Sequence, residues 1–188
     1  NDVNAQITDL KSHQLRKVQK FSQSKDWAAL EEYALDNLEK SSVFYYYAAD
    51  SALMMGKGLL AIDRFTQFLK NGGHSYWHFG VRAVAITIPY YYELANDQEV
   101  VDLAKPSLLE RYLKEGNAIP KAAVADALLK YASSLTLTKE PEIAEALSIL
   151  RGIKRYAELH EDIPNDVLDM VNQQITSIES QIIAIGRA

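Results

Sequence analysis

The sequence predicts an all-α protein, on two observations. Apolar residues recur at helical spacing along the whole chain, and no stretch alternates apolar and polar residues for long. The 188 residues, 48% of them hydrophobic, suit a single domain over 1–188 whose core needs no disulfide. No apolar run reaches the length of about 18 residues that a membrane-spanning helix requires, so no membrane span is expected.

Glycine, proline and capping residues divide the chain into about nine expected helices. They cover approximately the ranges 2–24, 27–38, 43–55, 58–70, 74–95, 97–115, 120–138, 141–159 and 164–186. The first helix has one apolar stripe, made of Val3, Ile7, Leu10, Val18 and Phe21. Ser24 or Asp26 is expected to cap the second helix. Gly56 ends the third helix and Asn71-Gly72-Gly73 ends the fourth, because glycine readily adopts the left-handed conformation of a helix end.

Prolines mark the later helices. Pro89 lies inside the fifth expected helix and should kink it, and Pro106 should interrupt or kink the sixth. The sixth helix stops at Gly116-Asn117. The seventh, eighth and ninth helices begin at Pro120, Pro141 and Pro164, since proline suits the first helical turn.

The last expected helix, about 164–186, has a narrow aliphatic stripe. Its members are Val171, Ile175, Ile178, Ile182 and Ile185, spaced alternately four and three residues apart. The opposite face is polar and nearly uncharged, as expected of a helix that caps a stack of helices. We therefore expect this helix to cap the domain by packing on the eighth helix. The alternative is a homodimer in which two copies of the last helix form a coiled coil.

Two short motifs each occur twice in the chain, and the two copies are separated by nearly the same number of residues. Tyr45-Tyr46-Tyr47 returns as Tyr90-Tyr91-Tyr92, 45 residues later, and Phe68-Leu69-Lys70-Asn71-Gly72 returns as Tyr112-Leu113-Lys114-Glu115-Gly116, 44 residues later. Repetition of a helix pair at such a period is typical of an α-solenoid.

Residues 42–75 resemble one tetratricopeptide (TPR) repeat of about 34 residues. Ala49 and Ala61 stand where the family has small residues, Gly56 at its turn, and Phe65 at its second-helix aromatic position. Phe68 and Gly73 depart from the family pattern. The resemblance implies a right-handed, TPR-like α-solenoid of antiparallel helix pairs that serves as a non-enzymatic protein- or peptide-binding scaffold.

First helices line the concave face in that family. Carried over to this sequence, the resemblance places four residues in a binding groove: Tyr46, Asp50, Leu53 and Met54. The internal repeat adds Tyr90 and Tyr91 as candidates for the neighbouring wall. The alternative is that these tyrosines pack between helices, because aromatic side chains bury large areas.

Few residues in the sequence have the types and spacing of a catalytic or metal-binding site. His74 and His78 are four residues apart, which is the spacing of paired zinc ligands on a helix, but packing or surface histidines are the expected reading. The cluster Tyr76, Trp77, His78 and Phe79 is either an aromatic recognition site or inter-helix packing. No phosphate-binding loop or spaced catalytic set is recognisable. We therefore expect no enzymatic activity, no cofactor and no metal.

The charge and the cysteine content of the chain bear on which partners and which cellular location are expected. Residues 1–94 have ten basic and ten acidic side chains, whereas residues 95–188 have ten and fifteen. The net charge of −5 argues against nucleic-acid binding.

The absence of cysteine and a start at Asn1 favour a periplasmic or secreted protein, with the cytoplasm as the alternative. The other functions considered are a structural segment of a larger bacterial cell-envelope assembly and an enzyme with an unrecognised site.

Overall fold

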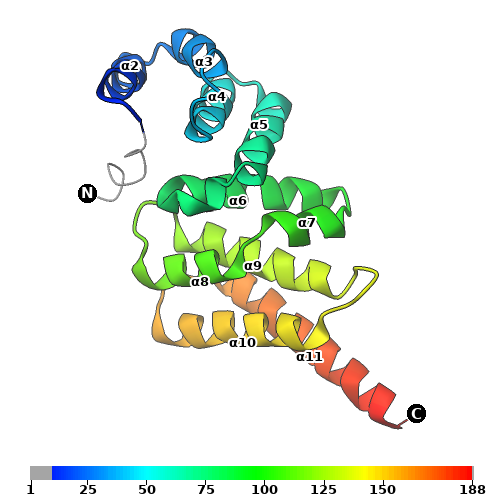
Figure 1. Ribbon diagram of the computed structural model, residues 1–188. Coiled ribbons are helices and arrows are strands. Elements are labelled where there is room, and N and C mark those ends of the chain that lie inside the picture. The colour runs from blue at the N-terminus through cyan, green and yellow to red at the C-terminus, as the bar shows by residue number, and fades with distance from the viewer. Residues whose placement is uncertain (1–9, 188) are drawn as a thin grey trace. The chain divides into compact units, whose positions relative to one another are not determined.

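The computed structural model describes residues 10–187, and every regular element in that range is helical (Figure 1). The all-α class is confirmed. The elements are α2 (Ser12–Gln23), α3 (Trp27–Leu35), α4 (Val43–Met54), α5 (Gly58–Lys70), the short 3₁₀ helix η1 (Gly73–Ser75), α6 (Trp77–Glu93), α7 (Asp97–Leu103), α8 (Pro106–Glu115), α9 (Lys121–Leu135), α10 (Ile143–Leu159) and α11 (Asn165–Arg187).

The described residues contain ten α-helices where about nine were expected, because Pro106 separates the sixth into α7 and α8. Pro106 occupies the first turn of α8, where its missing N–H costs no hydrogen bond. By contrast, α6 continues through Pro89 to Glu93. The Val3 and Ile7 part of the first expected stripe lies outside the described residues.

Several predicted helix ends are confirmed by their capping geometry. Asp26 rather than Ser24 caps α3, since its side chain accepts a hydrogen bond of 3.2 Å from the N–H of Ala29. Gly56 and Gly72 follow α4 and α5 with φ of 78° and 85°. These left-handed values favour glycine and stop each helix.

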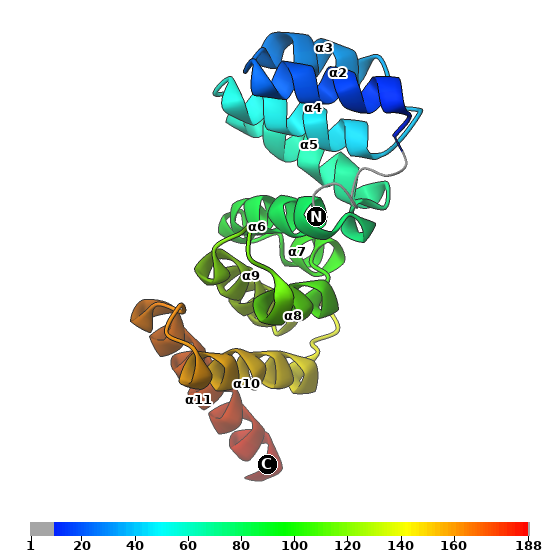
Figure 2. The same cartoon turned by 90° about the vertical axis from the view of Figure 1, so that its left-hand side faces the viewer.

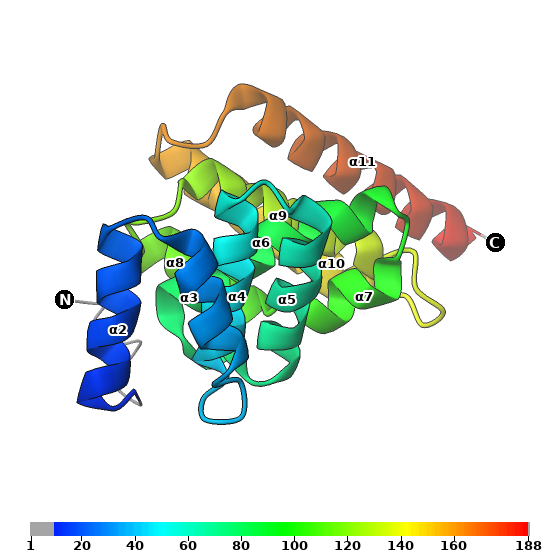
Figure 3. The same ribbon diagram turned by 90° about the horizontal axis from the view of Figure 1, so that it is seen from above.

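The chain forms two compact units, Asn1–Thr87 and Ile88–Ala188. In the first unit, α2 packs on α3, α3 on α4, and α4 on α5 (Figure 3). In the second unit α9 is central and packs against α7, α8, α10 and α11. Its buried residues include Leu128 and Leu135, which are 1% exposed. The core of each unit therefore comes from helices close in sequence.

The shared motif of α5 and α8 occupies the same place in both helices. Phe68 and Tyr112 are fully buried near the helix ends, and a glycine packs on each ring. The two glycines are not equivalent in the motif, because Gly73 follows the motif glycine Gly72, whereas Gly116 is the motif glycine itself. A Cβ added to Gly73 would lie 2.7 Å from the Phe68 ring, and one added to Gly116 would lie 2.4 Å from the Tyr112 ring. These glycines are thus required by close approach to an aromatic side chain.

Ala61 is expected to reject a larger side chain. It is 0% exposed on α5, which packs on α4. Ala61→Leu should lower the free energy of unfolding by about 1–3 kcal/mol through overpacking. Denaturant unfolding of the variant checks this, and an unchanged midpoint would mean that the TPR-like register of residues 42–75 is misplaced.

Helix α11 packs on α10 and α9 through part of its aliphatic stripe. Val171, Ile175 and Ile178 are buried, whereas Ile182 and Ile185 are 46% and 76% exposed. The last turns of α11 run beyond α10, which explains why the stripe is covered only in part (Figures 1 and 2). No helix among the described residues combines the length and apolar character needed to cross a membrane.

Candidate binding site

The four α4 residues expected in the groove differ in exposure. Tyr46 is 5% exposed, Asp50 and Leu53 are half-buried, and Met54 is 51% exposed. Their spacing of four, three and one residues places them along one side of α4. We call these four residues the α4 stripe. It is buried at Tyr46 and open to solvent at Met54.

Tyr46 lies in a cluster of aromatic rings from three helices. Its ring stacks on Phe79 of α6, with centroids 4.0 Å apart and planes 14° apart. Phe65 and Phe68 of α5 approach it edge-on, with centroid distances of 5.6 and 5.4 Å. Such contacts stabilise beyond the area they bury. The Tyr46 ring therefore packs α4 against α5 and α6.

Arg82 joins Tyr46 to Asp50. Its Nη1 donates hydrogen bonds to the Tyr46 hydroxyl oxygen at 2.9 Å and to Asp50 Oδ1 at 2.6 Å. Burial raises the pKa of Tyr46 to about 12, so the phenol is neutral at physiological pH and accepts this bond. The Arg82 and Asp50 side chains are 32% and 21% exposed, so the ion pair reaches solvent. We call the contact between α4 and α6 at Tyr46, Asp50, Phe79 and Arg82 the α4–α6 seam.

Sequence reasoning missed Arg82, although a signal was present. Asp50 is the one charged residue of Val43–Met54, and Arg82 is the one Lys, Arg, Asp or Glu between Trp77 and Tyr92. Two lone opposite charges on apolar helices that pack together are expected to pair, because a buried unpaired charge is costly. What the sequence lacked was evidence that these two helices are neighbours.

Tyr90 and Tyr91 do not occupy the positions of Tyr45 and Tyr46. The first tyrosine triplet lies in the opening turns of α4, and the second lies at the end of α6. Tyr90 and Tyr91 are half-buried and meet edge-on with centroids 5.2 Å apart. The two tyrosine triplets therefore lie at non-equivalent positions of their helices, so the internal repeat does not support the groove assignment of Tyr90 and Tyr91, which stays a prediction.

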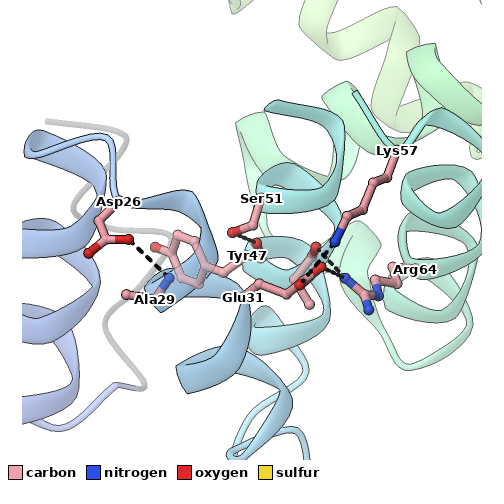
Figure 4. A network of polar contacts seen from close by, with 8 residues as sticks. Asp26, Ala29, Glu31, Tyr47, Ser51, Lys57 and Arg64 are labelled. Carbon is pink, nitrogen blue, oxygen red and sulfur yellow. Dashed lines mark hydrogen bonds and ion pairs between the residues drawn. The ribbon is translucent and has the colours of Figure 1, made fainter. Parts of the chain in front are cut away.

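A second polar network joins α3, α4 and α5 in the first unit (Figure 4). Arg64 Nη1 donates to Glu31 Oε2 at 2.5 Å and to the carbonyl oxygen of Ala48 at 3.1 Å. Lys57 Nζ reaches Glu31 Oε1 at 3.5 Å. Burial raises the pKa of Glu31, but Arg64 and Lys57 outweigh it, so the carboxyl titrates below its ordinary value of 4.5.

Glu31→Gln is expected to destabilise the protein in a pH-dependent way. A carboxyl whose pKa is lowered on folding stabilises the fold above its unfolded pKa, and this contribution is lost as pH falls through the folded pKa. The variant should thus be less stable than the parent at pH 7 and equally stable well below pH 4.5. Urea unfolding at several pH values checks this. Glu115→Gln is the control, because the Arg111–Glu115 pair is 63% and 59% exposed and should contribute little. An equal deficit of Glu31→Gln at every pH would contradict the ionic explanation.

The two histidines considered as metal ligands do not share a helix. His74 lies in η1, and His78 lies in α6 with 7% exposure. Within residues 10–187, no group of three or more His, Asp or Glu side chains is placed to hold a metal ion. Tyr76 and Phe79, from the same aromatic segment, pack on Phe68 and Tyr46.

Known proteins give no independent guide to the site. Neither protein-family models, nor curated proteins, nor solved structures yield a match to this chain. The functional argument accordingly depends on the geometry of the two units.

Proposed function

We propose that this protein is a non-enzymatic, TPR-like helical-repeat scaffold that binds a peptide segment of a partner protein along the α4–α6 seam. The observation that carries the proposal is the partly exposed Asp50–Arg82 ion pair, which lies next to the stacked rings of Tyr46 and Phe79. In a right-handed α-solenoid of antiparallel helix pairs, α4 and α6 would be first helices of successive pairs. Such helices line the concave surface of a solenoid.

Burial along residues 42–75 supports the TPR-like register. Ala49, Ala61 and Phe65 are all 0% exposed, and α4 packs on α5. Small residues at 49 and 61 allow close approach of the two helices, and Phe65 fills the space beside them. The equivalent burial of Phe68 and Tyr112 near the ends of α5 and α8 supports a repeat that extends outside this segment.

The seam has the chemistry to bind a peptide backbone. Both hydrogen bonds of Arg82 leave from Nη1, which keeps the Nε and Nη2 donors available within the described part of the chain. Guanidinium donors suit carbonyl and carboxylate oxygens. The Tyr46 and Asp50 bonds hold the guanidinium in place, so little side-chain entropy is lost on binding. The exposed Met54 adds an adaptable apolar contact on the same side of α4.

Peptide selection followed by amide hydrogen exchange tests this function. A random peptide library displayed on phage is selected against the protein, and the enriched peptide is added to the parent at saturation. Residues 43–54 and 77–87 should gain protection, while α9 and α10 should exchange as before. Selection of no peptide, or protection confined to the second unit, would overturn the proposal.

A further inference from the structure

The second unit contains a cavity of about 320 Å³ between α8, α9 and α10. These helices lie side by side, with α9 packed on both of the others (Figure 2). The floor of the cavity is aliphatic, and its members are 1–7% exposed: Leu113, Leu128, Ile149 and Ile153. Ligand pockets begin at about 300 Å³, so the cavity suits a small ligand.

Gly152 leaves empty space at the wall of this cavity. It lies in the middle of α10 and lines the cavity, although glycine is among the poorest helix formers. A Cβ added to Gly152 would meet no atom within 4 Å, whereas those added to Gly73 and Gly116 would clash with aromatic rings. No close approach or left-handed backbone therefore requires this glycine. The space that it leaves is part of the cavity.

Two cationic side chains also line this cavity. Lys114 of α8 and Arg155 of α10 both contribute to its lining, and neither forms an ion pair or hydrogen bond with another residue between 10 and 187. Glu110 contributes one carboxylate. The Tyr156 hydroxyl donates to Asp162 Oδ2 at 3.1 Å, so this hydroxyl is already engaged. The lining thus presents two unpaired positive charges against one negative charge.

We propose that this cavity binds a small amphipathic anion, namely a free carboxylate with an apolar chain. The chain would cover the aliphatic floor and occupy the space beside Gly152. The carboxylate would meet Lys114 and Arg155, whose unpaired charges it complements. This site lies wholly in the second unit and is independent of peptide binding at the α4–α6 seam.

Titration calorimetry with octanoate and octanol tests the charge requirement. Octanoate should bind at least tenfold more tightly than octanol, since both have the same chain length and only octanoate is charged. The double variant Lys114→Gln, Arg155→Gln should lose this preference. Lys154→Gln is the control, because Lys154 is exposed on α10 and does not line the cavity. Equal binding of the two probes, or an equal effect of the control, would overturn the proposal.

Filling the cavity tests its location. Gly152→Leu should weaken octanoate binding at least tenfold. Gly152→Ala should bind octanoate with less than a threefold loss and melt about 2–4 °C higher, because alanine is the better helix former. Circular dichroism confirms that each variant is folded. Across hexanoate, heptanoate and octanoate, affinity should rise by up to about fourfold per methylene. Undiminished binding to a folded Gly152→Leu variant, or tighter binding of a leucine-ended hexapeptide than of octanoate, would contradict the assignment.

Discussion

Tyr46→Ala is expected to remove about 3–5 kcal/mol from the free energy of unfolding. The substitution empties the centre of the aromatic cluster, where the Tyr46 ring contacts Phe65, Phe68 and Phe79. It also removes one of the two hydrogen-bond acceptors of Arg82. Because whole domains are stable by only about 5–15 kcal/mol, this loss should be plain in a denaturant unfolding curve.

Tyr46→Phe separates the ring from its hydroxyl. The ring contacts remain, and only the hydrogen bond from Arg82 is lost, so the cost should be about 1–2 kcal/mol. If Tyr46→Ala and Tyr46→Phe were both within 0.5 kcal/mol of the parent, roughly the spread of a neutral surface substitution, the packing role of Tyr46 would be wrong.

Deletion of residues 164–188 is expected to unfold the second unit or cause aggregation. Three aliphatic side chains of α11 are buried in contact with this unit: Val171, Ile175 and Ile178. At about 1.5–3 kcal/mol for each buried side chain, their loss costs roughly 5–9 kcal/mol. That amount is comparable with the whole stability of a domain. Light scattering and circular dichroism of the truncated chain check this expectation.

Removing only residues 182–188 is the matched control. Ile182, Ile183 and Ile185 are 46%, 53% and 76% exposed, so their removal should leave the stability unchanged. Size-exclusion chromatography of the two truncated chains decides between a cap and the homodimer alternative. A stable, soluble chain lacking residues 164–188 that had changed from dimer to monomer would show that α11 associates two copies instead of capping one.

The sequence predicts the helix ends well where local chemistry determines them. The bounds of α5 agree with the expected 58–70, because Gly56 precedes it and Gly72 follows it in left-handed conformations. The position of α3 follows from the capping side chain of Asp26. These signals lie within a few residues of the helix ends that they determine, so no knowledge of tertiary packing is needed.

Features that depend on contacts between helices could not be located in this way. The pairing of Asp50 with Arg82 joins residues 32 positions apart, and nothing in the sequence placed α4 beside α6. The two tyrosine triplets look alike in sequence but lie at the start of one helix and the end of another. Similarly, Gly152 is a lone glycine in a helical pattern, and nothing in the sequence shows that it lines a cavity.

The affinity of the selected peptide for exposed-methionine variants tests binding at the α4 stripe most directly. Met54 and Met170 are 51% and 49% exposed, so truncating either should leave the fold intact. Met54→Ala is predicted to weaken peptide binding at least fivefold, and Met170→Ala, on α11 of the other unit, to change it less than twofold. Equal Kd values for the parent and both variants would contradict peptide binding along α4.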